Sequence, residues 1–496
     1  MAPLAQVAAP APVAPSTIVF AHFNDVYEID AVENGASGGM ARLAAALDRL
    51  RRNNSAVVTT LGGDFLSPSA LGTAVVAGEP LAGRQMVDLL NTVGVQWATL
   101  GNHEFDLSES AFHKRLAEAK FKVVISNATD AAGKPFADTV QSAIVRVRSG
   151  ARTVRVGLIG LVIDSTRKAW VRYLPPVETA RAQVDALKGK VDAIVALTHL
   201  SLLQDQAVVE AVPEIDLILG GHEHENWSIR RGTRFTPIVK ADANVRSLAV
   251  VAMKFSGASR PEVSVRFELL DTRIAPLPRV QQQVKKWVDT AYDAFRRDGL
   301  DPAAVVASLP EILDGRELTV RNRPGNLTTL IVEAMRTAAK SDAAVLNGGS
   351  IRIDDQLPAG PVRQYDVIRV LPFGGKVLKV TLDGGLLRQI LEAGEANLGS
   401  GGFLHLAGIT RRDGAWTVGD RPLDSAAVYT VAMPEFLLTG QETRMAFLTR
   451  DKLREVQDLP DIRLVLIAEL KRRYPAGGLA SDWLGYRFQR EAGFAR

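Results

Sequence analysis

Short apolar runs alternate with helical patterns over the first half of the chain. The runs are rich in β-branched residues and are flanked by Gly, Asn or Asp, which is typical of strands. Between them, residues 40–50 and 86–93 repeat apolar side chains at helical spacing. The pattern predicts an α/β domain layered around central sheets. The predicted strands cover residues 17–23, 56–61, 97–100, 123–125, 154–158, 192–197, 216–219 and 248–254.

A proline-bearing break at residues 272–278 ends this alternation. A polar-faced helix is predicted over 281–297, and a second unit with its own helices and strands follows it. In that unit we predict helices at 330–339 and 385–393 and strands at 343–346, 376–382 and 428–433. The predicted division is a flexible lead-in (1–16), a first domain (17–275), a linker helix (276–300) and a second domain (301–496).

The composition limits the chemistry of the chain. Its 496 residues include no cysteine, which excludes disulfides, thiolate metal sites and thiol nucleophiles. A net charge of +4 over so long a chain does not indicate a nucleic-acid polymer as partner, and no apolar run is long enough for a membrane span. Residues 1–15 are rich in alanine and proline, and we interpret them either as the start of an exported mature protein or as a plain disordered N-terminus. We expect a periplasmic or secreted location, with the cytoplasm as the alternative.

Five polar motifs follow predicted strands of the first domain, each at the point where an apolar run ends. Ligands bind at the carboxyl ends of the strands in an open α/β sheet, so we expect the motifs to converge along one sheet edge. A single G-G-D is a common turn, but all five motifs in this order favour a functional site. The motifs are N-D (24–25), G-G-D (62–64), G-N-H-E-F-D (101–106), T-H (198–199) and G-G-H-E-H (220–224).

The motifs supply carboxylate oxygens, an amide oxygen and imidazoles, a set that suits divalent Zn, Mn, Fe or Co. Six ligands are too many for one tetrahedral ion, whereas two ions that share one aspartate would use all of them. Two ions about 3.5–4 Å apart can hold a bridging hydroxide and clamp both oxygens of an in-line phosphoryl displacement. The candidate ligands are Asp25, Asp64, Asn102, His199, His222 and His224.

The three remaining histidines receive plainer interpretations. His22 lies inside the first predicted strand, where a core position is favoured over a ligand. His113 falls in a helical pattern and is expected on the surface, and His405 follows a glycine-bearing turn and is expected to be structural.

The order D, GD, GNHE, H and GHxH resembles that of the calcineurin-like metallophosphoesterases. The second unit narrows the resemblance to the 5′-nucleotidase family. Residues 345–352 (V-L-N-G-G-S-I-R) are similar to the N-G-G-x-x-R signature of its C-terminal domain, residues 371–375 (L-P-F-G-G) to its P-F-G motif, and residues 435–440 (E-F-L-L-T-G) to its second aromatic motif. The resemblance covers about residues 17–450. It implies a four-layer α/β/β/α metallophosphoesterase domain and a second, α+β C-terminal substrate-binding domain.

The resemblance also implies a role for each matching residue. Two divalent metal ions (Mn, Zn, Co, Fe or Mg) would be bound, the first by Asp25, Asp64 and His224, the second by Asp64, Asn102, His199 and His222. His103 would face the phosphate, and Asp106 would orient its ring.

In the second domain the resemblance implies a nucleotide-binding set. Asn347 and Arg352 would contact the substrate, with Arg323 as a further arginine and Arg321 as the alternative if the alignment shifts. Phe373 and Phe436 would sandwich the base, although without the resemblance both phenylalanines would be assigned to the core.

Three positions depart from the family pattern. Tyr27 stands where a histidine ligand is expected, and we predict a more weakly bound ion there and a phenol that hydrogen-bonds to a ligand or to a phosphate oxygen. The alternatives are a phenolate that binds the metal directly and a side chain that turns away into the core. Glu442 lies in T-G-Q-E-T-R (439–444), where the family has G-G-D-G and an aspartate near the base or ribose. R-P-G-N-L-T-T-L (323–330) replaces a more acidic, glycine-bearing segment.

These features predict a two-domain, dimetal phosphomonoesterase that hydrolyses nucleoside 5′-monophosphates or related nucleotides. The alternatives with the same chemistry are a 2′,3′-cyclic nucleotide phosphodiesterase, a UDP-sugar hydrolase and a sulfur-oxidation hydrolase. The alternative of another class is a degenerate nucleotide-binding or adhesion protein, for which Tyr27 is the only support.

Overall fold

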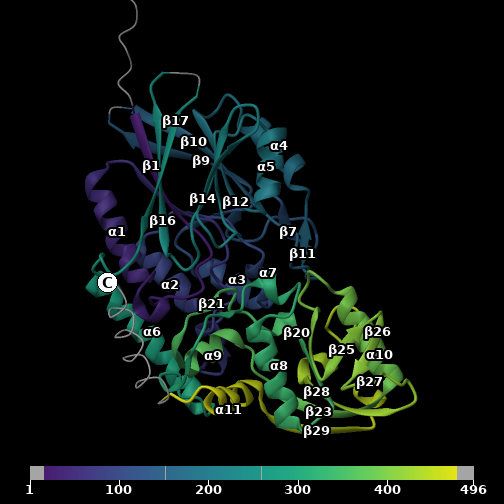
Figure 1. The fold of residues 1–496 in the computed structure, drawn as a ribbon. Helices are drawn as coiled ribbons and strands as arrows, with labels where there is room; N and C mark the ends of the chain where they lie inside the picture. The colour runs from purple at the N-terminus through teal and green to yellow at the C-terminus, as the bar shows by residue number, and fades with distance from the viewer. Residues whose placement is uncertain (1–15, 151, 258–259, 477–496) are drawn as a thin grey trace, which may run out of the picture. The chain divides into compact units, whose positions relative to one another are not determined.

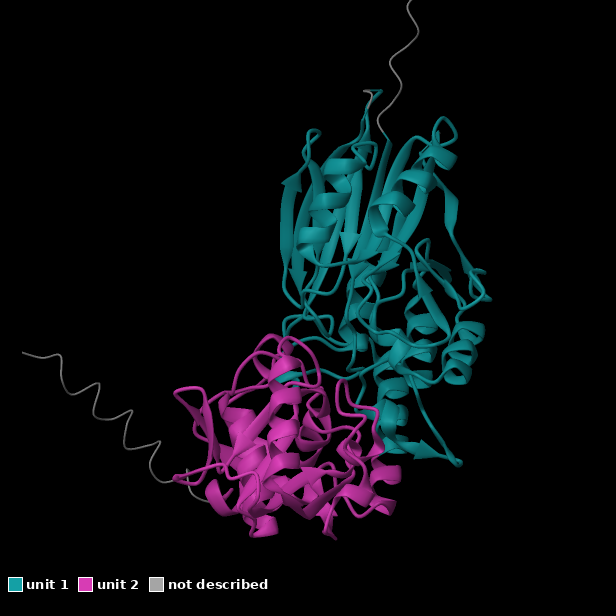
Figure 2. Cartoon of the chain, turned by 90° about the vertical axis from the view of Figure 1, so that its right-hand side faces the viewer, with its two compact units in different colours: residues 1–291 teal, residues 292–496 magenta. Residues whose placement is uncertain are grey.

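A computed structural model of the protein describes residues 16–150, 152–257 and 260–476. The predicted lead-in therefore lies outside the described residues except for Ser16. The chain divides into two compact units, residues 1–291 and 292–496 (Figure 2). The division falls within helix α6 (Pro278–Arg297), which begins earlier than the predicted helix because proline is well suited to the first turn of a helix.

Two large sheets form the centre of unit 1. The seven-stranded sheet has the order β17-β16-β1-β2-β5-β6-β8, and its strands from β1 to β8 run parallel. The six-stranded sheet has the order β14-β15-β13-β12-β10-β9, with parallel strands from β15 to β10. The strands of the first sheet are β17 (Glu262–Leu269), β16 (Ser247–Phe255), β1 (Ser16–Phe23), β2 (Val57–Leu61), β5 (Trp97–Ala98), β6 (Lys122–Val124) and β8 (Thr139–Val140). Those of the second are β14 (Trp227–Arg231), β15 (Thr236–Lys240), β13 (Leu217–Gly220), β12 (Ala193–His199), β10 (Arg152–Val162) and β9 (Ser142–Ser149).

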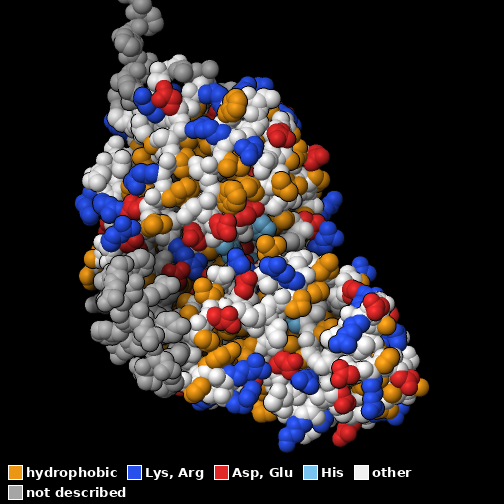
Figure 3. Space-filling view, viewed as in Figure 1, with side chains coloured by type: hydrophobic (Ala, Val, Ile, Leu, Met, Phe, Trp, Pro, Cys, Tyr) orange, Lys and Arg blue, Asp and Glu red, His pale blue; other side chains and the backbone are white. Residues whose placement is uncertain are grey.

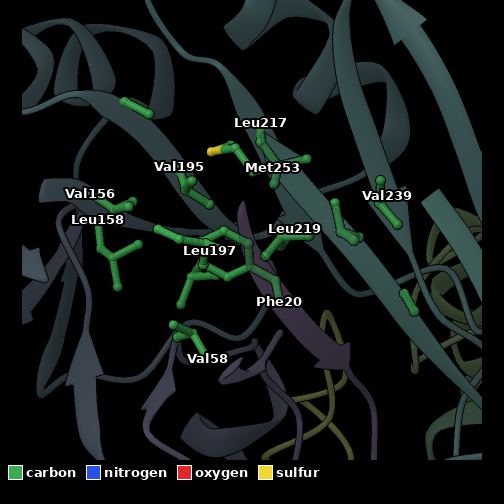
Figure 4. Packing of buried hydrophobic residues seen from close by; sticks show 14 of the residues in the cluster. Phe20, Val58, Val156, Leu158, Val195, Leu197, Leu217, Leu219, Val239 and Met253 are labelled. Atoms are coloured by element: carbon green, nitrogen blue, oxygen red, sulfur yellow. The ribbon is translucent and has the colours of Figure 1, made fainter. Parts of the chain in front are cut away.

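The two sheets pack face to face over one apolar core. Phe20 and Val58 from the first sheet meet Leu197 and Leu219 from the second, as Figure 4 shows. Successive side chains of a strand point to opposite faces. Residues 193, 195 and 197 of β12 therefore line this core, and residues 194 and 196 lie in a second core with helices α4 and α5.

Helices cover the outer faces of the sheets, which gives the four-layer α/β/β/α arrangement. Helices α1 and α4 lie on opposite sides of the strands of unit 1 (Figure 1). The predicted helices at 40–50 and 86–93 are confirmed as α1 and α2. The helices are α1 (Met40–Asn53), α2 (Arg84–Val93), α3 (Glu109–Glu118), α4 (Pro176–Leu187) and α5 (Leu202–Ala211), and the small strands are β3 (Val75–Val76), β4 (Glu79–Pro80), β7 (Ala128–Asp130) and β11 (Val171–Tyr173).

Unit 2 is an α+β domain around a five-stranded mixed sheet of order β24-β20-β28-β23-β29. Its strands are β24 (Leu404–Ala407), β20 (Ala343–Asn347), β28 (Val428–Pro434), β23 (Lys376–Asp383) and β29 (Glu455–Asp461). The helices are α7 (Glu317–Val320), α8 (Asn326–Ala339), α9 (Gln364–Val370), α10 (Gly384–Ala396) and α11 (Ile462–Arg473). Small sheets add β18 (Val305–Leu309), β19 (Leu313–Asp314), β21 (Gln356–Leu357), β22 (Gly360–Arg363), β25 (Ile409–Arg412), β26 (Ala415–Val418) and β27 (Arg421–Pro422).

The surface is mixed in charge. Figure 3 shows basic side chains interspersed with acidic ones over the face in view, which agrees with the small net charge. Among the described residues, none of the helices is both long and apolar enough to span a membrane.

Candidate dimetal active site

The five polar motifs of unit 1 lie at the carboxyl ends of β1, β2, β5, β12 and β13 or in the loops that follow them. Three of these strands belong to the seven-stranded sheet and two to the six-stranded sheet. The motifs therefore converge from two sheets, which corrects the expectation of a single sheet edge. The physical reason is that strands buried on both faces have nearly continuous apolar runs, and such runs do not reveal which sheet each strand joins.

The backbone of these loops is shaped to bring the ligand side chains together. Asp25, Asp64 and His222 have positive φ angles of 53°, 52° and 87°. Such angles are uncommon outside glycine and cluster at functional sites. A Cβ atom on Gly101 would lie 2.0 Å from Asp64 Oδ1, and one on Gly221 would lie 2.9 Å from Asp25 Oδ2. Only glycine lets the backbone approach the carboxylates this closely.

Asp25, Asp64 and His199 form a buried cluster whose ligand atoms all lie within 4.8 Å of one another. His199 Nε2 lies 3.1 Å from Asp64 Oδ2 and 3.8 Å from Asp25 Oδ1. His199 Nδ1 donates to the Gly62 carbonyl at 2.7 Å. That hydrogen bond fixes the ring and aims Nε2 at the carboxylates, as is usual for histidines that bind metals.

Two buried atoms test whether the site fits metal ions. Asn102 Oδ1 is buried without a hydrogen-bond partner, and His199 Nε2 makes no hydrogen bond of good geometry although it faces two carboxylates. Buried polar atoms are almost always satisfied, so two such atoms beside two buried carboxylates call for a cation. Oxygen and imidazole ligands suit divalent transition metals. The donor set therefore fits the predicted metals.

His222 and His224 lie at the same site. His224 Nε2 is 3.3 Å from Asp25 Oδ1, and the ring centroids of His199 and His222 are 5.3 Å apart. The His222 backbone N–H donates to Asp25 Oδ2 at 2.9 Å. The structure thus brings five predicted ligands into contact and places Asn102 directly before His103, whose backbone N–H donates to Asp64. The individual roles of all six stay predictions.

Tyr27 also lies among the ligands. Its hydroxyl is 3.0 Å from His224 Nε2 and donates to Asp25 Oδ1 and Asp64 Oδ2 at 3.2 Å each. The side chain is only 7% exposed. This geometry excludes the interpretation in which the phenol turns away into the apolar core.

His103 and Asp106 form a pair beside the cluster. His103 Nδ1 is 2.7 Å from Asp106 Oδ2, so the carboxylate fixes the plane of the ring as predicted from the family. The His103 backbone N–H donates to Asp64 Oδ1 at 2.9 Å. The backbone of His103 is therefore held by the carboxylate that we expect to be shared by both ions.

Glu104 is a functional residue that the sequence reasoning missed. Its buried carboxylate accepts from the backbone N–H groups of Gly101, Asp64, Phe65 and Leu66. It thereby fastens the loop after β2 to the loop after β5. Burial and the charge of Asp64 raise the pKa of Glu104 to about 7. The sequence signal for Glu104 is its position within the G-N-H-E-F-D motif (101–106), between the predicted ligand Asn102 and Asp106.

The electrostatics of the cluster follow from burial and mutual contact. For His199, burial opposes the charged form, but the carboxylates of Asp64 and Asp25 outweigh it and raise the pKa to about 9. Burial likewise opposes ionisation of Asp25 and Asp64, but the histidines keep the pKa of each carboxyl below its usual value. Burial lowers the pKa of His222 to about 3. The cluster is thus anionic and ready to take up cations.

The other histidines occupy plainer sites. His22 is fully buried and bonds to the Gly220 carbonyl and Thr60, so it is a core residue as interpreted. His405 Nε2 is 2.7 Å from the Val320 carbonyl inside unit 2, in keeping with a structural role. His113 is half-buried on α3, where its ring packs against phenylalanines of the same unit.

Unit 2 carries the predicted substrate residues at one end of its sheet. Val377 of β23 pairs with Pro434 of β28, so the loop before β23 and the loop after β28 are neighbours. These loops hold Phe373 and Phe436, which are 58% and 39% exposed. Their exposure contradicts the alternative assignment to the core. The Arg352 guanidinium lies 5.4 Å from the centre of the Phe373 ring.

Asn347 and Glu442 form a second pair in unit 2. Asn347 Nδ2 donates to Glu442 Oε2 at 2.7 Å, and both residues are buried. Arg323 is exposed, whereas Arg321 is ion-paired with Glu317. The pairing of Arg321 makes it the poorer candidate for a substrate phosphate. The substrate roles of these residues stay predictions.

Comparison with known proteins defines the class first. Residues 18–226 match the family model of calcineurin-like phosphoesterases, and residues 305–449 match that of the 5′-nucleotidase C-terminal domain. The protein is a hydrolytic enzyme of the metallophosphoesterase type, a class that uses two divalent metal ions. The chain belongs to the 5′-nucleotidase family, which joins these two domains.

Individual relatives agree with this assignment. The bovine 5′-nucleotidase is 25% identical over 503 residues, which cover 88% of this chain and 84% of that protein. A crystal structure of a 5′-nucleotidase precursor from Thermus thermophilus has a TM-score of 0.73 at 24% identity and covers 92% of this chain and 96% of its own. The sulfate thiohydrolase SoxB of the same organism has a TM-score of 0.68 at 17% identity, covering 92% and 94%. The two structures show the shared fold.

Proposed function

We propose that the protein hydrolyses nucleoside 5′-monophosphates to nucleoside and phosphate. The observation that carries this proposal is the exposed pair Phe373 and Phe436 on neighbouring loops of unit 2. Exposed aromatic side chains of this kind suit stacking on a base. The buried Asn347–Glu442 pair adds polar groups in the same unit that suit a nucleoside.

The residues of unit 1 supply the phosphoesterase chemistry. When bound, two divalent ions provide a hydroxide nucleophile and neutralise charge on the phosphate oxygens. Asp25, Asp64, Asn102 and the histidines of the cluster would hold those ions. We assign His103 to the phosphate, where an imidazole positioned by Asp106 can stabilise or protonate the oxygen on which charge develops.

A substrate panel tests the proposal. Phosphate release would be measured from AMP, ADP, UDP-glucose, 2′,3′-cyclic AMP and a small artificial phosphate ester, each with a chelator and with added Mn²⁺. We expect the nucleoside monophosphate to have the highest kcat/KM and chelation to abolish turnover. A preference for the cyclic nucleotide or the UDP-sugar would show that the proposed substrate is wrong, but it would leave the proposed metal-dependent hydrolysis standing. Full activity in verifiably metal-free protein would overturn the metal assignment. A periplasmic or secreted location stays a prediction, and fractionation of expressing cells would test it.

A further inference from the structure

A buried lysine contacts the two segments of unit 1 that carry His199, His222 and His224. Lys240, the last residue of β15, has no exposed surface. Its Nζ donates to the Leu200 carbonyl at 2.7 Å, lies 2.8 Å from Asp205 Oδ2, and donates to Glu223 Oε2. An ammonium group has three N–H donors, and this one has two hydrogen-bond acceptors and an ion pair with Asp205.

The two acceptors belong to the loops that carry the predicted histidine ligands. Leu200 directly follows His199, and Glu223 stands between His222 and His224. Glu223 Oε1 in turn accepts from the Leu202 backbone N–H. The ammonium and the Glu223 carboxylate therefore connect the loop after β12 to the loop after β13.

The ion pair with Asp205 anchors this connection to the scaffold. Asp205 is fully buried on α5, the helix that packs on the six-stranded sheet. A Cβ atom on Gly220 would lie 3.0 Å from Lys240 Cε, so the lysine stem fills the space beside the G-G-H turn. Burying a charge is costly unless it is paired, and removing one partner of such a network leaves the others uncompensated. Removing Lys240, Asp205 or Glu223 would therefore destabilise the whole network of buried charges.

We propose that Lys240, acting through Glu223, is a positioning residue that sets the geometry of His199, His222 and His224 for metal binding. The inference rests on the metal assignment of the proposed function. It does not depend on which nucleotide is the substrate. Groups that orient metal ligands typically contribute about 10- to 100-fold to metal affinity.

The test measures metal affinity and stability separately. Calorimetric titration of wild-type protein with Mn²⁺ comes first, and failure of the wild type to bind would overturn the metal assignment and this inference with it. Normal binding by the wild type with unchanged affinity in the variants would overturn this inference alone. We expect Lys240→Met to raise the dissociation constant about 10- to 100-fold and to lower the metal-free Tm. Glu223→Ala, which changes a partly exposed side chain, should weaken binding in the same way and serves if Lys240→Met does not fold.

A second variant separates positioning from stability. Adding Asp205→Asn to Lys240→Met removes the uncompensated buried charge, so Tm should recover while metal affinity stays low. Recovery of affinity together with Tm would mean that the lysine only stabilises the fold, and the inference would be wrong.

Arg260 provides the matched control. It donates to Asp216 Oδ1 at 2.7 Å and to the Ile215 carbonyl at 2.8 Å, just before β13 begins and so at the other end of that strand from the metal loops. Arg260→Gln should lower Tm and leave metal affinity within about twofold of wild type. Equal losses of affinity in Arg260→Gln and Lys240→Met would overturn the positioning role.

Discussion

Metal binding should release a proton from His199. In the metal-free protein, the carboxylates of Asp64 and Asp25 overcome the effect of burial and raise the pKa of His199 to about 9. Its Nε2 must lose this proton before it can bind a cation. His222 has a pKa lowered to about 3 by burial and is already neutral. Affinity should therefore rise with pH until His199 is deprotonated.

The size of the effect follows from the titration of one group. At pH 7 a group with a pKa near 9 is almost fully protonated, and its deprotonation costs about 2.7 kcal/mol at 1.36 kcal/mol per pH unit. Between pH 7.5 and 8.5 the apparent association constant should rise about eightfold. This interval is chosen because Glu104, with a pKa near 7, is largely ionised throughout it.

Isothermal titration calorimetry with Mn²⁺ under nitrogen measures both the association constant and the number of protons released on binding. Titrations at the two pH values give the affinities, and two buffers of different ionisation enthalpy give the number of protons released. We expect close to one proton at pH 7.5. His113→Ala, which alters a histidine outside the cluster, is the control and should behave as wild type. An affinity that changes less than twofold, with no dependence on the buffer, would show that His199 is neutral in the metal-free protein and would refute the reasoning.

Two further predictions concern the catalytic and base-binding side chains. His103→Ala should lower kcat by about 10²- to 10⁴-fold with little change in metal affinity. Asp106→Asn should lower kcat less, because Asp106 only holds the His103 ring. Normal turnover of the His103 variant in a steady-state assay would contradict the assignment of His103 to the phosphate. Phe373→Ala and Phe436→Ala should each raise KM for nucleotides about ten- to hundredfold, since stacking contributes roughly 1–3 kcal/mol per base, and should leave a small artificial ester nearly unaffected. Equal losses on both substrates would argue against base stacking.

Much of the catalytic site could be predicted from the sequence because its ligands lie at the ends of strands. Asp25, Asp64 and His199 each end or follow a buried strand, and parallel strands bring such positions to one side of the fold. The eight predicted strands of unit 1 are confirmed to within a few residues, except that β10 extends to Val162 and β5 ends at Ala98.

The contacts that hold the ligands could not be predicted in the same way. Glu104 binds four backbone N–H groups that lie near it only after two loops have folded together. Lys240 and Asp205 meet across a sheet and a helix, and sequence periodicity assigns neither a partner. Sequence patterns report which face of an element is buried, whereas the pairing of buried charges depends on tertiary packing.

Tyr27 is the position where the chain departs most clearly from its family. A phenol has an unperturbed pKa near 10, so at neutral pH it binds metal poorly unless the metal displaces its proton. In the structure its hydroxyl donates to Asp25 and Asp64 and lies 3.0 Å from His224 Nε2, so it contacts all three residues assigned to the first ion. We therefore expect that ion to be the more weakly bound of the two, with the phenol as a hydrogen-bond donor to its ligands.

The comparison of Tyr27→His with Tyr27→Phe tests this assignment. An imidazole at position 27 adds a ligand without a proton to displace, so Tyr27→His should tighten one ion and leave the other unchanged in metal titrations. Tyr27→Phe removes the hydroxyl that faces two carboxylates but removes no ligand. A hydrogen bond to a charged group contributes roughly 1.5–3 kcal/mol, but the bound cation competes for the same oxygens, so only part of that free energy bears on metal binding. The affinity of that ion should therefore change by about tenfold or less. If the phenol instead binds the metal as phenolate, both variants would lose metal affinity. Metal addition to the wild type would then also produce the ultraviolet difference band of an ionised tyrosine. Unchanged affinity in both variants would show that the hydroxyl contacts seen in the structure do not bear on metal binding.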